Sequence, residues 1–233
     1  MKILSWIFLI LLLISCNSRK ENKELDSDMS RIEGREEMIK SEAELALGNQ
    51  VWMKNNLNVS TFRNGDIILE AQTEEEWQKA WQNGKPAWCY YVNNPNAAEK
   101  NSYGKLYNWH AVKDPRGLAP DGWRIPTKED WEQLINFLGG NNMAGNKMKT
   151  VSGWKKNDIK TSFFFALPTG GRSDNGKFDG LNESAWFWSD YYEVGIGPSF
   201  LDLSSWDHAG LVKGSNSSEG YGLSVRCIKE LPH

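Results

Sequence analysis

The stretch GWRIPTKEDWEQLINFLGG, residues 122–140, carries the signals of an extended segment followed by a helix. Pro126 disfavours the helical conformation in the residue before it, so residues 122–125 are predicted to form a strand or an extended loop. Thr127 and Asp130 make a capping-box pattern, in which the hydroxyl accepts from the Asp130 N–H and the carboxylate accepts from the Thr127 N–H. A helix is therefore predicted to begin here.

Apolar residues recur on one face of this helix, at Trp131, Leu134, Ile135 and Leu138. Gly139 and Gly140 can adopt the left-handed conformation that ends a helix. Trp131 is therefore predicted to pack in the core. Arg124 is interpreted as structural, because its guanidinium offers several fixed donors to carbonyls or to a buried carboxylate.

A second segment, TEEEWQKAWQNG at residues 73–84, repeats this pattern. Thr73 and Glu76 form a capping-box pair, Trp77 and Trp81 lie one turn apart, and Gly84 can end the helix. The sequence thus predicts two main helices.

The other signals are those of short strands. Runs of aromatic and β-branched residues bounded by Gly, Asn and Asp are AWCYYV, SFFFALPTGGR, SAWFWSDYYE, SFLDLSSW and GYGLSVRCIKE. Asn175-Gly176 between two runs is a hairpin signal. Two helices against mainly antiparallel, loop-rich strands predict an α+β domain.

Composition limits the classes of function. The chain has 233 residues and a formal net charge of −3, which fits neither a basic nucleic-acid binder nor an acidic disordered tail, so no nucleic-acid partner is expected. Twelve Trp residues indicate either a thick aromatic core or a surface that contacts a ligand.

The N-terminus, MKILSWIFLILLLISCN, predicts export. Its apolar run is shorter than the roughly 20 residues of a spanning helix, so residues 1–15 are predicted to be a cleaved signal peptide. Leu-Ile-Ser before Cys16 resembles a lipobox, which makes Cys16 the expected lipidated first residue of the mature protein. Charged residues dominate the stretch up to residue 46, which is interpreted as a tether. The expected partner is a membrane, reached through the lipid, and the outer membrane is favoured over the inner.

Seven blocks of sequence carry a family resemblance, in the order VWMKNNLNVSTFRNGD, WCYY, YGKLYNWHAVKDPRGLAPDGWRIPTKEDWEQLINFLGG, SGW, FFALPTGGR, WFWS and GLSVRCIKE. They resemble the Fibrobacter succinogenes major paralogous domain, here assigned to residues 47–230. More distantly, RIPTKEDWE and residues 223–227 are similar to blocks of the formylglycine-generating (sulfatase-modifying factor) family. The resemblance implies a C-type-lectin-like fold, with two main helices packed on short strands and long loops. It implies no activity, because a fold alone does not specify a function.

The sequence offers little for catalysis. The copper-binding cysteine pair of the formylglycine-generating enzymes is missing, and His110 and His208 lie far apart without metal-ligand spacing. Asp190, Asp202 and Asp207 could supply a carboxylate pair for hydrolysis, although isolated acids in loops are common. We therefore expect no cofactor, no metal and no catalytic residue.

The sequence offers more candidate residues for ligand binding than for catalysis. The calcium loop of sugar-binding C-type lectins has no clear counterpart, so calcium-dependent sugar binding is not expected. The late strands and loops, which correspond to the ligand face of the implied fold, carry the candidate ligand-binding residues Trp186, Trp188, Tyr191, Tyr192, Trp206 and Asp207. Alternation along a strand puts Trp186 and Trp188 on the same face, and core packing is the alternative role for this pair.

Cys89 and Cys227 are the two cysteines that remain after lipidation. Export exposes both to an oxidising compartment, and the implied fold brings the two ends of the domain together, so a disulfide is predicted between them. The alternative is a pair of buried free thiols.

These features together favour a membrane-anchored exported lipoprotein whose domain is a non-catalytic binding or adhesion module for glycan or protein. Two alternatives stay open. The domain could be an enzyme related to the formylglycine-generating family with altered chemistry, or a structural subunit of an envelope complex.

Overall fold

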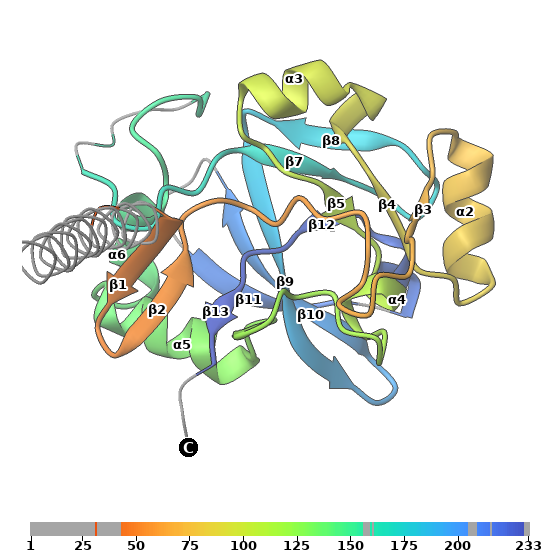
Figure 1. Ribbon diagram of the computed structural model, residues 1–233. Coiled ribbons are helices and arrows are strands. Elements are labelled where there is room, and N and C mark those ends of the chain that lie inside the picture. The colour runs from red at the N-terminus through yellow and green to blue at the C-terminus, as the bar shows by residue number, and fades with distance from the viewer. Residues whose placement is uncertain are drawn as a thin grey trace, which may run out of the picture. The chain divides into compact units, whose positions relative to one another are not determined.

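The computed structural model describes residues 31, 43–155, 159, 161–204, 209–214 and 216–230. The chain divides into two compact units, Met1–Ala43 and Glu44–His233, and the second holds the elements described below (Figure 1). None of the helices in the described ranges combines the length and hydrophobicity needed to cross a membrane. Cys16 and the predicted signal peptide lie outside these ranges.

The helices of the second unit are short. They are α2 (Glu74–Gln82), α3 (Pro95–Lys100), α4 (Trp109–Val112), α5 (Lys128–Phe137) and α6 (Asn141–Met148), with 3-10 turns η1 (Tyr91–Asn93) and η2 (Asn216–Gly220).

Strands make up most of the regular structure. They are β1 (Glu44–Leu47), β2 (Gln50–Met53), β3 (Leu69–Glu70), β4 (Ala87–Cys89), β5 (Leu106–Tyr107), β6 (Trp123–Arg124), β7 (Thr169–Arg172), β8 (Phe178–Leu181), β9 (Ser184–Glu193), β10 (Gly197–Ser204), β11 (Ala209–Lys213), β12 (Leu223–Ser224) and β13 (Ile228–Lys229). A four-stranded sheet has the order β1-β2-β13-β6. A nine-stranded sheet runs β11-β10-β9-β12-β5-β4-β3, and β7 joins it at β9 and carries β8.

The α+β, C-type-lectin-like fold predicted from the sequence is wrong. The domain is mostly β, with thirteen strands in curled sheets and five α-helices in the described part of the chain, rather than two helices packed on strands. α3 and α4 have only 6 and 4 residues, too few to give a helical periodicity in the sequence.

The two predicted helices begin and end through their local sequence. The capping boxes at Thr73 of α2 and Thr127 of α5 are both present, which confirms the predicted helix starts. Gly84 and Gly139 follow the two helices with φ of 63° and 104°, the left-handed region in which glycine is favoured. Trp123 and Arg124 form β6, so the extended segment before α5 is also confirmed.

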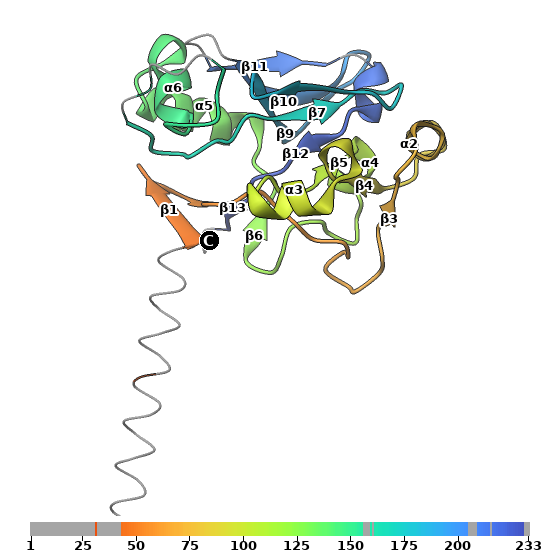
Figure 2. The same cartoon turned by 90° about the horizontal axis from the view of Figure 1, so that it is seen from above.

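Strands β9, β10 and β11 form an antiparallel ribbon, with α5 and α6 packed beside it (Figure 2). Residues on β9 alternate between its faces, as a strand requires. Phe187 and its partner Leu201 point to the helices, while Trp188 and Phe200 point to the other face and join a different cluster. The alternation predicted for Trp186, Phe187 and Trp188 is therefore present.

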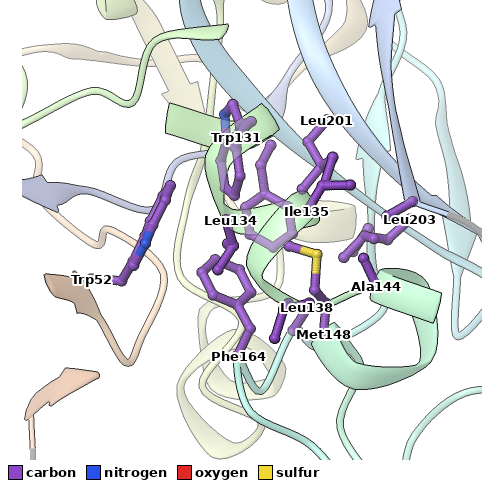
Figure 3. Packing of buried hydrophobic residues seen from close by; sticks show 14 of the residues in the cluster. Trp52, Trp131, Leu134, Ile135, Leu138, Ala144, Met148, Phe164, Leu201 and Leu203 are labelled. Carbon is purple, nitrogen blue, oxygen red and sulfur yellow. The ribbon is translucent and has the colours of Figure 1, made fainter. Parts of the chain in front are cut away.

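The first core cluster lies between this ribbon, the two helices and β2. The ring centroids of Trp131 on α5 and Trp52 on β2 are 4.6 Å apart with the planes tilted by 33°, and Phe164 packs edge-on against both rings. Figure 3 shows Leu201 and Leu203 of β10 meeting side chains from α5 and α6. Trp131 is fully buried, as predicted.

Half of the tryptophans donate their indole N–H groups to backbone carbonyls. Those that do so are Trp77, Trp81, Trp88, Trp131, Trp154 and Trp188. Buried Trp requires such a partner for its N–H. Seven of the twelve Trp residues are buried, so the thick aromatic core accounts for more than half of them.

A buried arginine ties the C-terminal segment to the start of the domain. Arg226 donates through Nε and Nη2 to Asn56 Oδ1 at 3.1 and 2.6 Å, and through Nη1 to the Phe164 carbonyl. Burial lowers the pKa of Arg226 to about 9, because no carboxylate offsets the loss of hydration. The arginine of the GLSVRC block is therefore an interior residue.

The predicted disulfide is not found: Cys89 and Cys227 are free and buried. Cys89 and Ser224 pair with Leu106 from opposite sides, so they lie two strand spacings, or roughly 9.6 Å, apart, and Cys227 follows three residues later. This strand spacing is longer than the roughly 4.4–6.8 Å between the Cα atoms of a disulfide. Burial raises the pKa of each thiol to about 12.

Candidate functional site

A half-open pocket of about 290 Å³ lies where β7, β8, β9 and β10 meet the C-terminal segment. It is lined by Gly171, Arg172, Ser173, Asp179, Trp186, Phe200, Asp202, Tyr221 and Leu223. Pockets that bind small molecules combine an apolar lining with a few placed polar groups, and this lining has that composition.

Trp186 is one wall of the pocket, and two glycines make room for its indole. A Cβ on Gly171 would lie 2.9 Å from Trp186 Cε3, and a Cβ on Gly180 would lie 2.7 Å from Trp186 Cη2. The ring therefore rests across the β7–β8 hairpin. Within the described part of the chain, the Trp186 indole N–H has no hydrogen-bond partner, unlike the six that donate to carbonyls.

The PTGGR segment explains the close approach. Gly170 has φ of 61°, and a Cβ there would come within 2.3 Å of the Asp179 carbonyl oxygen, so this position excludes any side chain. Gly171 follows it beneath Trp186. The sequence pattern predicts only a strand-like run here, although a Gly-Gly inside a strand is a signal for close approach of another group.

Arg172 is buried and holds the hairpin in place. Its Nε donates to the Gly176 carbonyl at 2.8 Å, Nη1 to Ala71 at 2.7 Å and Nη2 to Thr73 at 2.8 Å. Trp77 and Phe178 cover the guanidinium, at 4.8 and 4.7 Å from the ring centroids. Each of its three nitrogens is thus engaged by the protein, and only part of Arg172 contributes to the pocket wall.

The remaining polar groups of the lining are the carboxylates of Asp179 and Asp202 and the hydroxyls of Ser173 and Tyr221. Asp202 is the cross-strand partner of Trp186, and Asp179 is the partner of Gly171. The Asp179 carboxylate accepts from the Gly180 N–H at 2.7 Å, and the Ser173 hydroxyl is 2.7 Å from Asn175 Oδ1. The arrangement can therefore accept hydrogen bonds from a ligand while an indole face packs against it.

The structure brings only some of the sequence candidates together. Trp186 lines the pocket, whereas Trp188 is fully buried and donates to the Tyr107 carbonyl at 2.7 Å, which is the core role left open by the sequence. Trp206 and Asp207 lie outside the described residues.

Tyr191 and Tyr192 lie towards the other end of β9. They are 5 and 6 residues from Trp186, or roughly 17–20 Å along the strand. Tyr192 stacks on Trp109 with centroids 6.1 Å apart, and its hydrogen bond to Glu219 raises its pKa. Lys128 Nζ lies 5.9 Å from the Tyr191 ring centroid. The two tyrosines therefore do not line the pocket.

Arg124, Thr127 and Asp130 form one contact at the start of α5. Both guanidinium Nη atoms of Arg124 donate to the Asp130 carboxylate, which also accepts from the Thr127 N–H at 2.7 Å. Burial alone would raise the pKa of Asp130, but these hydrogen bonds outweigh it and hold the pKa below its usual value. Arg124 lies on β6 of the four-stranded sheet, whereas the strands that line the pocket belong to the nine-stranded sheet.

Of the three acids suggested for a carboxylate pair, Asp190 and Asp202 are described, and they do not lie together. Asp190 forms an ion pair with Lys113 at 2.6 Å. It lies four residues along β9 from Trp186, which is the cross-strand partner of Asp202. His110 Nε2 is 3.0 Å from the Trp81 carbonyl, and His208 lies outside the described residues. No group of three or more His, Cys, Asp or Glu in the described ranges could hold a metal ion.

Comparison with known proteins decides the family. The family model described as the Fibrobacter succinogenes major domain matches residues 45–229. The chain belongs to this family. The match covers every strand and helix of the second unit from Leu45 to Lys229, including all residues of the pocket.

Further comparisons add no relatives. No curated protein and no solved structure matches this member of the Fibrobacter succinogenes major domain family. A function for this chain is therefore inferred from the residues that line its pocket.

Proposed function

We propose that this domain is a non-catalytic binding module that takes a saccharide in the Trp186 pocket, as part of an exported protein anchored to a membrane by a lipid on Cys16. The observation that carries the proposal is the indole of Trp186, which lines a pocket that also holds the carboxylates of Asp179 and Asp202.

Sugar rings fit this chemistry. Their C–H faces pack on aromatic rings, and their hydroxyl groups donate to carboxylates such as Asp179 and Asp202. The unengaged indole N–H of Trp186 can donate to a ring hydroxyl in return. A volume of about 290 Å³ is at the lower end of the range for ligand pockets, roughly 300–1,000 Å³, so one ring or a chain end fits best.

Calorimetric titration with a panel of oligosaccharides tests the proposal. The Trp186→Ala variant is expected to lose at least about ten-fold in affinity, because the stacking surface is removed. Tyr192→Ala is the matched control, an aromatic on the same strand that lies outside the pocket, and it should bind like wild type. Circular dichroism and melting curves confirm that both variants fold. Equal binding by wild type and Trp186→Ala would reject the site.

A protein ligand is the second candidate. It is favoured by the turn between β9 and β10, where Val194 is 91% exposed and Ile196 is 36% exposed. Apolar side chains at an exposed turn suit a protein contact. A pull-down from envelope extract with Val194→Ser as control tests this candidate, which predicts a partner that the variant fails to retain.

The lipid anchor has its own test. Each buried methylene of an acyl chain contributes about 0.8 kcal/mol to membrane attachment, so acylation of Cys16 would hold the module at a bilayer. Cys16→Ser is expected to remain unprocessed or to become soluble. Palmitate labelling of that variant, with membrane fractionation unchanged, would contradict the anchor.

A further inference from the structure

The charged groups that line the pocket are unequal in what they offer a ligand. Asp179 and Asp202 are carboxylates, and Arg172 is the one cationic residue among the described lining residues. Each nitrogen of Arg172 already donates to a carbonyl, and the residue is buried. A ligand in the pocket therefore meets acceptors and negative charge, with no lysine among the described residues of the lining.

The two carboxylates flank the Trp186 ring. The local strand order is β8-β7-β9-β10, with Asp202 directly opposite Trp186 on β10 and Asp179 opposite Gly171, the residue beneath the ring. Cross-strand partners have Cβ atoms roughly 4.5–5.5 Å apart, so a group stacked on the indole is within reach of Asp202.

Two further aromatic rings line the cavity. Phe200 and Tyr221 are 6.4 Å apart by ring centroids, at an interplanar angle of 62°, and both line the pocket with Trp186. The faces of such rings attract cations, and carboxylates at their edges add a charge-assisted hydrogen bond. Aromatic faces combined with carboxylates suit an ammonium group better than a neutral or anionic substituent.

We propose that the pocket recognises an amino sugar whose amine is free and charged, with the sugar ring packed on Trp186 and the ammonium group directed to Asp202 and Asp179. This inference rests on the proposed function, since it names the class of saccharide for the same site.

Three tetrasaccharides that differ only at carbon 2 serve as probes: β-1,4-linked glucosamine, N-acetylglucosamine and glucose. Titration at about pH 6 keeps the amine charged. The glucosamine tetramer is expected to bind at least about ten-fold more tightly than the other two, and the preference should weaken as salt screens the carboxylates.

Asp202→Asn is expected to reduce the preference for the glucosamine tetramer over the glucose tetramer to within about three-fold, since it removes charge and keeps the shape. Asp179→Asn, at an exposed position, provides the same test should the first variant fold poorly. Asp121→Asn is the matched control, because its side chain is 88% exposed and it does not line the pocket.

The outcomes separate this inference from the proposed function. Equal binding of the three tetramers, with loss of all three in Trp186→Ala, would overturn the amino-sugar preference and leave the saccharide site in place. A preference for the acetylated tetramer would do the same. Absence of binding by every tetramer would overturn both.

Discussion

Gly171 is the position at which the packing of the pocket can be tested most sharply. It lies in β7 with no left-handed φ, so an alanine there meets a steric constraint rather than a backbone one. The new Cβ would lie 2.9 Å from Trp186 Cε3, 3.0 Å from the Gly222 carbonyl oxygen and 3.2 Å from Leu223 Cδ2. Ordinary contacts between carbons are at 3.5–4.0 Å, so at least one neighbour must move.

The neighbours are not free to move. The Gly222 carbonyl accepts from the Arg172 N–H at 2.9 Å, and the Trp186 ring also lies close against Gly180. Overpacking by one methyl group in such a site costs about 1–3 kcal/mol. At about 2–4 °C per kcal/mol for a domain of this size, the melting temperature should fall by several degrees.

Gly210→Ala is the matched control, because Gly210 also lies in a strand and a Cβ there meets nothing within 4 Å. Both substitutions replace glycine by alanine, so they restrict the unfolded chain equally. This restriction alone stabilises the folded state of each variant by about 0.4–1 kcal/mol. The difference in unfolding free energy between the two variants therefore isolates the clash. It can be measured by urea denaturation followed by tryptophan fluorescence and circular dichroism.

Equal stability of Gly171→Ala and Gly210→Ala would refute this packing of Trp186 on the β7–β8 hairpin. A Gly171→Ala variant that is destabilised by about 1–3 kcal/mol relative to the control supports it. Such a variant should also bind saccharide more weakly, because the indole that forms the wall of the pocket has been displaced.

Two further predictions concern groups with shifted pKa values. Asp130→Asn should cost about 1 kcal/mol at neutral pH, since it weakens the cap at Thr127 and the pair with Arg124. The pKa of Asp130 is lowered in the folded state, so this carboxylate stabilises the protein fully above its unfolded pKa of about 3.9. That stabilisation is lost as the pH falls through the folded pKa, so the difference in stability between the variant and wild type should shrink in acid. A difference that is constant with pH in urea titrations would contradict this. Cys89 and Cys227, with pKa raised to about 12, should resist alkylation at about pH 8 in the folded protein and react fully once unfolded. Between the unfolded value of 9.0 and the folded value of about 12 the unfolded state binds fewer protons, so stability should fall as pH rises. Non-reducing peptide mapping that recovers a disulfide would show this assignment to be wrong.

Features set by neighbouring residues could be predicted from the sequence. The capping boxes of α2 and α5 need only four consecutive residues, and the glycines that follow each helix act locally. The hairpin at Asn175-Gly176 is present as the turn between β7 and β8, and the run SAWFWSDYYE forms β9 in full.

The fold class and the site depend on pairings between distant segments, which the sequence does not display. β12 brings residue 223 beside β5 and β9, and this long-range pairing is what places Tyr221 and Leu223 at a pocket formed by β7 to β10. The predicted disulfide is wrong for the same reason, because an even number of cysteines does not indicate which strands separate the two thiols.

The sequence predicts ligand-binding residues from their residue type. Residue type does not distinguish a buried indole from one that lines a cavity. Trp186 and Trp188 lie on the same face of β9, but Trp188 is covered by Trp109 and Phe200, whereas Trp186 meets only glycine on the β7–β8 side. The glycines of PTGGR were the available signal, since they mark where another group approaches the backbone closely.

A crystal structure of the domain with the glucosamine tetramer bound would test the central claim most directly. The account predicts one sugar ring packed on the Trp186 indole, with its ammonium group within hydrogen-bond distance of Asp202 or Asp179. A sugar bound elsewhere on the domain, with the Trp186 pocket empty, would contradict it.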